Sequence, residues 1–238
     1  MRNLLSDSAA KFDPARAGEY QEQSRIALAG YDACHELAAA ILAAALGTGS
    51  RAQVLIVGAG GGAPEISNAH RLEPNWRFTA VDPSAAMLEL TRQHLNQAGL
   101  DDCTELHLGL VEDLPEQSAF DAATLIGVLH HVPGDEAKVA LLASIAKRLK
   151  PGAPLILAGN RLVYREHPLL LAAWGNRWRM TGATPAEVEV KLGKILQGAD
   201  PPAAESTVFN LLADAGFERP LSFFSSLFWG AWIAYRAG

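Results

Sequence analysis

The alternation of strand-like and helix-like segments between residues 51 and 160 constrains the fold more than any other feature of this sequence. Short apolar runs of strand length are separated by segments whose apolar residues recur at helical spacing. Such alternation predicts a parallel β-sheet covered by helices on both faces. The expected strands are residues 53–58, 76–82, 104–109, 120–128 and 153–160, and the expected helices between them are 64–72, 83–99 and 135–152.

The segments on either side of this core extend and cover the sheet. Residues 31–46 are predicted as one Ala- and Leu-rich helix, and residues 205–217 as a final helix. Residues 218–236 predict two strands that meet near Ser226 and Leu227, which completes a seven-stranded sheet with an antiparallel hairpin. We therefore expect a single domain made of a helical N-terminal cap (1–50), a core (51–160), an inserted helical lid (161–200), and the final helix with the hairpin (201–238).

Composition limits the class of protein. The chain has 238 residues, 49% of them hydrophobic, which suffices for one well-buried α/β domain. A net charge of −6 argues against broad nucleic-acid binding, which needs a basic surface. The longest apolar run, residues 37–46, is too short to span a bilayer, and the N-terminus lacks a signal-peptide pattern. Cys34 and Cys103 lie far apart and form no CxxC pair, so we expect a reducing, cytoplasmic location.

A glycine-rich segment, VGAGGGAPE, follows the first expected strand at its carboxyl end. Open α/β sheets bind their ligands at that edge. Gly58 and Gly60 have no Cβ, so a ligand can lie directly against their backbone. The spacing from Gly58 through Gly60 to Ala63 also fits the dinucleotide fingerprint, which accepts alanine last. Alone, the segment leaves a plain tight turn between strand and helix as the alternative.

Asp82 ends the second expected strand, about twenty residues after the glycines. A carboxylate at this position can accept hydrogen bonds from both ribose hydroxyls of an adenosine. The alternative is a structural role, because either Asp82 or Ser84 can cap the helix that follows. The glycines and Asp82 together predict an adenosine-containing ligand but do not separate NAD from S-adenosylmethionine, which both carry that ribose.

Five segments, in order and at normal spacing, resemble the class I S-adenosylmethionine-dependent methyltransferases. They are VGAGGG, VDPSAAM, GLVEDLP, FDAATLIGVLHHV and LKPGAPLIL, and they cover about residues 51–160. The resemblance implies a Rossmann-like α/β fold, S-adenosylmethionine as cofactor and S-adenosylhomocysteine as product. A short-chain NAD-dependent dehydrogenase would instead need a Tyr-x-x-x-Lys pair, which the sequence lacks.

The family's cofactor-binding positions carry over to this sequence. The glycine segment would lie against the methionine part and the ribose, and Asp82 would hold the ribose. Pro83 and Met87 would flank the adenine, the turn that contains Leu110 would cover it, and Gly127 would pass beside the sulfonium. The residues implied in cofactor binding are Tyr31, Gly58, Ala59, Gly60, Asp82, Pro83, Met87, Leu110, Val111, Glu112 and Gly127.

One position departs from the family pattern. Where the family has an aspartate after the glycine of the third motif, this chain has Leu110 after Gly109. A contact from that side chain to the adenine amino group is lost unless Glu112 or Asp113 replaces it. The departure puts the affinity for the cofactor in question.

The flanking segments are similar to the carboxy-S-adenosylmethionine synthase branch of the family. In that branch a tyrosine that matches Tyr31 lies on a helix that closes over the cofactor; helix packing is the alternative role here. The synthases also hold the carboxylate of their modified cofactor with a lid arginine. The matching position lies near Leu192, flanked only by Lys191 and Lys194. This mismatch favours an ordinary methyltransferase over a synthase.

Candidate residues for the chemistry and the acceptor lie after the fourth and fifth expected strands. His130 and His131 follow the fourth strand, and either could act as a general base because histidine titrates near neutrality; supporting the loop is the alternative. In the lid, Arg161, Tyr164 and Trp174 could grip a planar or anionic small molecule, or belong to an ordinary amphipathic helix. The spacing of the histidines indicates no metal site.

We therefore expect methyl transfer to a small-molecule acceptor by in-line attack on the sulfonium methyl group. The alternatives are a carboxy-S-adenosylmethionine synthase, a non-catalytic S-adenosylmethionine-binding subunit and, last, an NAD-dependent oxidoreductase. The expected partner is a small molecule, with neither a membrane nor a nucleic acid, and a homodimer remains open. The sequence does not name the acceptor or its accepting atom.

Overall fold

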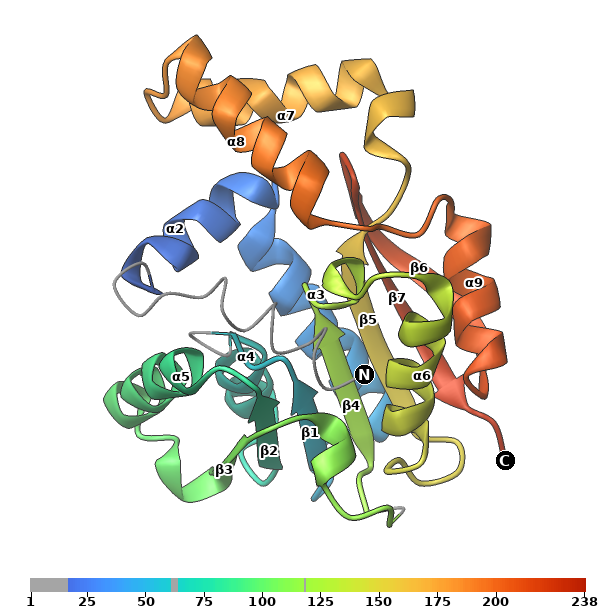
Figure 1. The fold of residues 1–238 in the computed structure, drawn as a ribbon. Coiled ribbons are helices and arrows are strands. Elements are labelled where there is room, and N and C mark those ends of the chain that lie inside the picture. The colour runs from blue at the N-terminus through green and yellow to red at the C-terminus, as the bar shows by residue number, and fades with distance from the viewer. Residues whose placement is uncertain (1–16, 61–63, 118) are drawn as a thin grey trace.

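The computed structural model describes residues 17–60, 64–117 and 119–238, so the first part of the expected N-terminal cap lies outside the described residues. Its strands are β1 (Gln53–Val57), β2 (Arg77–Asp82), β3 (Thr104–Leu108), β4 (Ala122–Ile126), β5 (Pro154–Asn160), β6 (Phe217–Ser226) and β7 (Trp229–Arg236). They form one seven-stranded sheet in the order β3-β2-β1-β4-β5-β7-β6 (Figure 1). The first five run parallel, and β7 pairs antiparallel with both β5 and β6, which confirms the expected sheet and hairpin.

Helices cover both faces of this sheet, as the alternation predicts. One face carries α3 (Tyr31–Leu46), α4 (Pro64–Leu72) and α5 (Ala85–Ala98), and the other carries α6 (Asp135–Ala146) and α9 (Glu205–Asp214). Strand β1 shows why both faces of the sheet need a cover of helices. Val54 and Ile56 belong to the core under α3, α4 and α5, whereas Leu55 and Val57 belong to the core under α6 and α9. All four side chains are buried because successive strand residues point to opposite faces.

The ends of α5 follow directly from the sequence. Ser84 is its N-cap, and the Ser84 hydroxyl accepts a hydrogen bond from the Met87 backbone N–H at 3.4 Å. Gly99 ends the helix in the left-handed conformation that glycine adopts without strain (φ 68°). These caps confirm both expected boundaries and fix where the chain leaves β2 and returns toward β3.

Residues 161–200 fold into a helical pair beyond the carboxyl end of β5, as predicted (Figure 1). After a short 3₁₀ turn, η5 (Tyr164–Glu166), come α7 (Pro168–Met180) and α8 (Pro185–Gly198). Together with the end of α2 (Ala17–Ala27) they form a core of their own, separate from the two cores on the sheet. Its buried members are Ile26, Tyr164, Trp174, Trp178, Val188 and Phe228.

The strand order reverses between β1 and β4, because β2 and β3 lie to one side of β1 and the later strands lie to the other. Open α/β sheets bind ligands in the crevice at such a point, outside the carboxyl ends of the strands. The loop after β1 is therefore the expected ligand loop by topology as well as by sequence. Among the residues that the structure describes, no helix combines the length and the apolar character needed to cross a bilayer.

Candidate functional site

The glycine loop begins with a residue that only glycine can occupy. Gly58 adopts φ 75°, and a Cβ added there would lie 2.3 Å from Cγ2 of Val128. Its backbone N–H donates to the Val81 carbonyl at 2.8 Å, which ties the end of β1 to β2. Gly60 also has a positive φ of 35°. The remaining members of the motif, residues 61–63, lie outside the described part of the chain.

Asp82 connects this loop to the start of α5. Its Oδ2 accepts from the Gly60 N–H at 3.2 Å, and its Oδ1 accepts from the Ser84 N–H at 2.8 Å. Burial raises the pKa of the Asp82 carboxyl, and the hydrogen bonds from Ser84 and Gly60 partly offset this rise. Since Ser84 occupies the N-cap position, Asp82 is not the capping residue. Each oxygen keeps a further lone pair for a ligand hydroxyl.

The residues predicted at the adenine lie around the ends of β2 and β3. Met87, in the first turn of α5, is buried. Pro83, which lies just before this helix, is exposed. The Gly109 N–H donates to the Asp82 carbonyl at 3.1 Å, so the turn that carries half-buried Leu110 is held beside Asp82. In this turn, η3 (Val111–Asp113), Val111 is buried and Glu112 is exposed.

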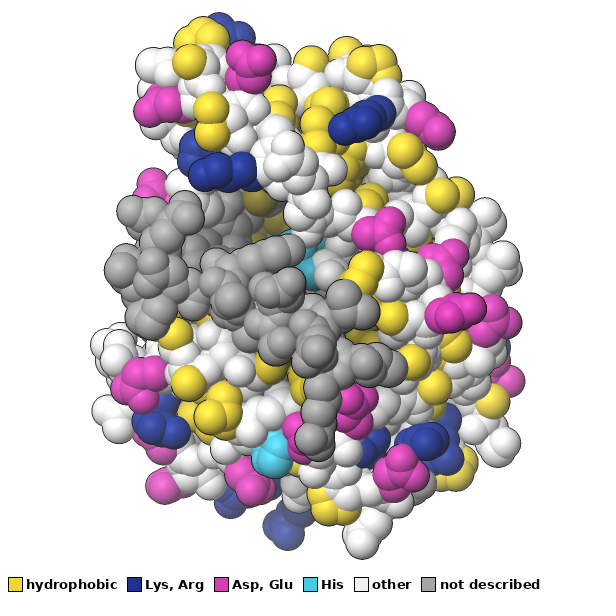
Figure 2. All heavy atoms as spheres, in the orientation of Figure 1, with side chains coloured by type: hydrophobic (Ala, Val, Ile, Leu, Met, Phe, Trp, Pro, Cys, Tyr) yellow, Lys and Arg dark blue, Asp and Glu magenta, His cyan; other side chains and the backbone are white. Residues whose placement is uncertain are grey.

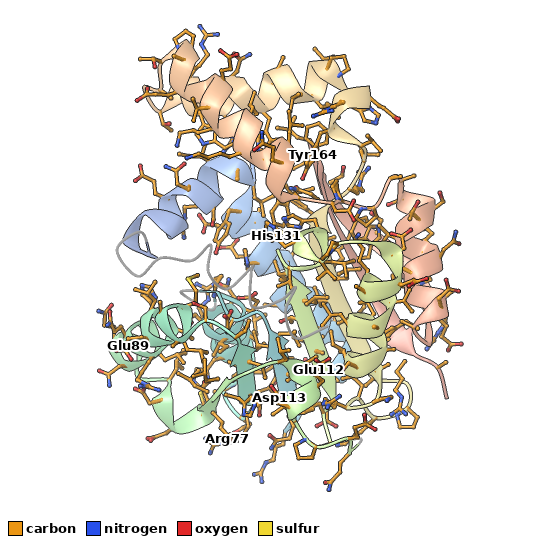
Figure 3. All side chains as sticks on the ribbon, in the orientation of Figure 1. Arg77, Glu89, Glu112, Asp113, His131 and Tyr164 are labelled. Atoms are coloured by element: carbon orange, nitrogen blue, oxygen red, sulfur yellow. The ribbon has the colours of Figure 1, made fainter. Side chains whose placement is uncertain are left out.

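Of the two acids that could replace the family's missing aspartate, Asp113 already has a partner. Its Oδ2 accepts the Leu110 N–H at 2.8 Å, and Figure 3 shows Glu112 and Asp113 on the side of the site away from α7 and α8. Asp113 therefore shapes the turn, while the side chain of Glu112 is exposed.

One cavity of about 350 Å³ extends from the glycine loop to the helical pair. Figure 2 shows the recess below α7 and α8, with hydrophobic and histidine side chains inside it and Lys or Arg side chains along its rim. Of the residues predicted from the sequence, it brings together Tyr31, Gly58, Ala59, Gly60, Gly127, His130, His131 and Trp174. The lining that the sequence did not single out includes Gln23, His35, Glu65, Trp178, Ile195 and Trp229.

This lining suits a polar organic ligand. Two of its polar atoms, Glu65 Oε2 and Trp229 Nε1, are buried without a hydrogen-bond partner among the described residues. Buried polar atoms are almost always hydrogen-bonded, so a ligand that offers both donors and acceptors fits here. No group of three or more His, Cys, Asp or Glu side chains within residues 17–60, 64–117 and 119–238 is placed to hold a metal ion.

The two histidines of the site differ in exposure. His130 Nδ1 accepts from the Asn160 backbone N–H at 3.3 Å, so the neutral ring carries its proton on Nε2. Burial, followed by the charges of His131 and Lys138, holds the pKa of His130 well below its usual range. His130 is therefore a neutral hydrogen-bond donor. His131 is exposed and packs against it, with ring centroids 4.2 Å apart, at the foot of the helical pair (Figure 3).

Two residues that the sequence predicts to bind the methyl acceptor do not line this cavity. Tyr164 is buried in the lid core, and its hydroxyl accepts from Nδ2 of Asn160 at 2.8 Å. Burial raises the pKa of Tyr164 above its usual range, so the hydroxyl stays protonated. Arg161 donates to the Ser225 hydroxyl at 2.8 Å, on β6. Neither side chain is part of the cavity lining, because Tyr164 packs in the lid core and Arg161 bonds to β6.

The helical pair is fastened to the end of α2. Trp174 Nε1 donates to the Ala27 carbonyl at 2.7 Å, and Arg177 Nε donates to the Ile26 carbonyl at 2.7 Å. Lys191 Nζ donates to Oε1 of Gln23 at 3.0 Å. Because these bonds join segments about 150 residues apart, the sequence pattern of α7 and α8 alone could not have placed them.

The end of the lid is anchored beside the histidines. The Asp200 N–H donates to the His130 carbonyl at 2.8 Å, while Asp200 Oδ2 accepts from the Gly134 N–H at 2.7 Å and from Lys138 Nζ at 2.8 Å. Lys138 is only 1% exposed. Burial raises the pKa of Asp200, but the hydrogen bonds from Lys138 and Gly134 outweigh it, so the net shift is downward.

We expect Asp200→Asn to lower the free energy of unfolding by about 0.5–1 kcal/mol at pH 7, because Asp200 is partly exposed and its ion pair is screened. A lowered folded-state pKa stabilises above the ordinary aspartate pKa of about 3.9 and is lost as the pH falls through the folded value. The difference from the wild type should therefore vanish near about pH 2–3 in denaturant titrations. Asp214→Asn, at the exposed end of α9, is the control. A difference that persists undiminished in acid would contradict the assignment.

Comparison with known proteins matches the core of this chain to a methyltransferase domain. Residues 55–155 match the methyltransferase domain family. A ubiquinone biosynthesis O-methyltransferase from Xanthomonas axonopodis pv. citri is 37% identical over 109 residues, which are 45% of this chain and 42% of the relative. A carboxy-S-adenosyl-L-methionine synthase from Dichelobacter nodosus is 26% identical over 175 residues, which are 74% of this chain and 71% of the relative. The chain thus spans less than half the length of the first relative.

The fold is shared with solved methyltransferase structures. Human N-acetylserotonin methyltransferase, solved in complex with S-adenosylmethionine, superposes with a TM-score of 0.64 at 17% sequence identity. The superposition covers 98% of this chain and 59% of the human one. Residues 55–155 thus match a methyltransferase domain, and the chain shares the sheet of solved methyltransferases, with its glycine loop at the switch point.

Proposed function

We propose that this chain transfers the methyl group of S-adenosylmethionine to a small-molecule acceptor. The observation that carries the proposal is a continuous cavity that joins the glycine loop of the core to the helical pair. Its volume, about 350 Å³, lies within the range of small-molecule sites. In this proposal residues 51–160 supply the cofactor face and residues 161–200 supply the acceptor face of one domain.

The core end of the cavity suits the cofactor. Gly58 and Gly60 present backbone without side chains, so an amino-acid tail and a ribose have room to lie against the loop. Asp82 is held next to Gly60 by a hydrogen bond and has lone pairs left for the ribose hydroxyls. Gly127 lines the cavity at the end of β4, where the sulfonium would pass. The adenine would then reach the turn at Leu110, beside Met87.

The lid end of the cavity suits an acceptor with an apolar or aromatic body. Trp174 and Trp178 line it from α7, and Ile195 lines it from α8. Lys191 and Lys194 bring two ammonium groups to the same end. Large aromatic surfaces bind planar groups, and ammonium groups favour a negatively charged or strongly polar substituent.

The chain's own part in the chemistry is alignment and the exclusion of water. S-adenosylmethionine supplies an electrophilic methyl group on its sulfonium. The tryptophans of the lid and Trp229 would shield the acceptor from solvent while the walls of the cavity hold its nucleophilic atom in line. An acceptor whose nucleophile starts protonated also needs a base. His131 is the better candidate, because the free lone pair of the neutral His130 ring is already used by Asn160.

A labelling assay tests this function. The purified protein is incubated with S-adenosylmethionine labelled in its methyl group and a set of small phenols, amines and carboxylates. We expect the label to appear in one acceptor class, with one S-adenosylhomocysteine formed for each methyl group transferred. Formation of no methylated product from any class, although S-adenosylmethionine binds, would favour a non-catalytic binding subunit.

One observation favours a second candidate function. Lys191 and Lys194, which flank the position of the synthase arginine, both line the cavity and could hold a carboxylate. A carboxy-S-adenosylmethionine synthase would need such a contact, and one relative with that name is similar over most of this chain. Incubation with S-adenosylmethionine and prephenate separates the two functions. A cofactor that gains a carboxylate, detected by mass spectrometry, would replace the methyltransferase proposal.

A further inference from the structure

A buried histidine and a buried glutamate face each other at the core end of the cavity. His35 lies on α3 and Glu65 in the first turn of α4, and these two helices pack side by side on one face of the sheet. Both residues line the cavity next to the glycine loop. His35 is 3% exposed and Glu65 is 8% exposed. Neither residue belongs to the five sequence motifs of the family.

The hydrogen bonds of His35 show which ring nitrogen carries the proton. His35 Nδ1 lies 2.8 Å from the backbone carbonyl oxygen of Tyr31, which can only accept, so Nδ1 is the donor. In the neutral ring, Nε2 then presents a lone pair. This atom lies 3.9 Å from Oε1 of Glu65, which is too far for a direct hydrogen bond. In this tautomer Nε2 of His35 and Oε1 of Glu65 are both acceptors, so neither satisfies the other.

The glutamate has a second unmet requirement. Its Oε2 is buried and has no hydrogen-bond partner among the described residues. Burial raises the pKa of the Glu65 carboxyl, and the nearby His35 offsets only part of this rise. Burial and the charge of Glu65 together raise the pKa of the neighbouring Cys34 thiol to about 12, so Cys34 stays neutral and offers no countercharge. A cationic donor is what this pair lacks.

We propose that His35 and Glu65 form the binding site for the α-ammonium group of the amino-acid tail of S-adenosylmethionine. The inference rests on the proposed function, because it needs that cofactor at the core end of the cavity. An ammonium group has three N–H donors, enough to reach Nε2 of His35 and the carboxylate of Glu65 together. The Tyr31 ring packs against the His35 ring at 4.3 Å between centroids, with the ring planes tilted by 42°.

The cofactor is a better source of this ammonium group than an amine acceptor. A buried carboxylate stabilises the protonated form of an amine beside it. A protonated acceptor nitrogen has no lone pair with which to attack the methyl group, so binding here would inhibit the reaction. The α-ammonium group of the cofactor takes no part in the transfer and loses nothing by remaining charged.

The test compares two ligands that differ only in this group, S-adenosylhomocysteine and deamino-S-adenosylhomocysteine, by calorimetric titration. We expect Glu65→Gln to weaken the binding of S-adenosylhomocysteine by about 10- to 100-fold, the effect of losing a charge-assisted hydrogen bond in a buried site. Binding of the deamino ligand should change by less than about twofold. His35→Gln should give a smaller loss that is also confined to the ligand with the amine.

Glu73→Gln is the matched control. Glu73 is also buried, at 3% exposure, and accepts the Gly49 N–H at 2.8 Å, away from the cavity. Glu73→Gln should leave the affinities for S-adenosylhomocysteine and for its deamino analogue unchanged. Should Glu65→Gln fail to fold, the wild type still decides, since it must bind the amine-bearing ligand at least about 10-fold tighter.

Two outcomes would overturn the proposal in different ways. Equal losses for both ligands in Glu65→Gln, or equal affinities in the wild type, would make the pair structural and leave the cofactor assignment standing. If neither ligand binds the wild type, the proposed function fails together with this inference.

Discussion

Gly58→Ala is expected to lower the free energy of unfolding by about 2–5 kcal/mol, because two separate penalties add at this position. A residue with a Cβ pays for the left-handed conformation at φ 75°. Its Cβ would also lie 2.3 Å from Cγ2 of Val128. The backbone cannot easily move away, since the Gly58 N–H is bonded to the Val81 carbonyl. Denaturant titration of the wild type and the variant measures the loss.

Two further variants separate the penalties. Gly152 has nearly the same φ, 76°, and a Cβ there would meet nothing within 4 Å. Gly152→Ala should therefore show only the conformational part, about 1–2 kcal/mol. In a double-mutant cycle, Val128→Ala should recover part of the loss in Gly58→Ala. If Gly58→Ala and Gly152→Ala have equal effects, close packing at the glycine loop does not limit this position.

Asp82→Ala is expected to weaken the binding of S-adenosylhomocysteine by about 1–3 kcal/mol, or roughly 5- to 150-fold. The variant removes the proposed acceptor of the ribose hydroxyls, and it also releases the Gly60 and Ser84 N–H groups that Asp82 holds. Asp82 does not itself line the cavity, but its partner Gly60 does, so the release of the loop acts at the core end. Calorimetric titration of the wild type and the variant at one fixed pH measures the loss.

A modified ligand separates the ribose contact from the anchoring of the loop. An S-adenosylhomocysteine analogue without ribose hydroxyls cannot use the carboxylate, so its affinity should differ less between the wild type and Asp82→Ala. An equal loss for both ligands would assign Asp82 to the loop alone. Unchanged affinity for S-adenosylhomocysteine would remove the ribose assignment.

The sheet and its helices could be predicted because local signals and the fold agree. The apolar residues of β1, the Ser84 cap and the Gly99 stop each specify one local structure, and the structure has all three. Alternation along the chain then determines a parallel sheet, and a parallel sheet determines the edge at which the glycine loop and Asp82 meet. At this edge the sequence was sufficient to predict that the glycine loop and Asp82 meet.

The acceptor side could not be predicted because distant contacts set it. Arg161 and Tyr164 lie close to Trp174 in the sequence, but packing on β6 and in the lid core turns them away from the cavity. Glu65 gave a weak signal, as an acid directly after the glycine segment, and His35 lies four residues after Tyr31 on the same predicted helix. Only the packing of α3 against α4 brings these two side chains together.

The central claim is that the glycine loop and Asp82 hold S-adenosylmethionine and not a dinucleotide. Calorimetric titration of the wild-type protein with S-adenosylhomocysteine and, separately, with NAD tests it most directly. We predict saturable binding of one S-adenosylhomocysteine per chain and no heat of binding for NAD. Saturable binding of NAD, with none for S-adenosylhomocysteine, would contradict the account.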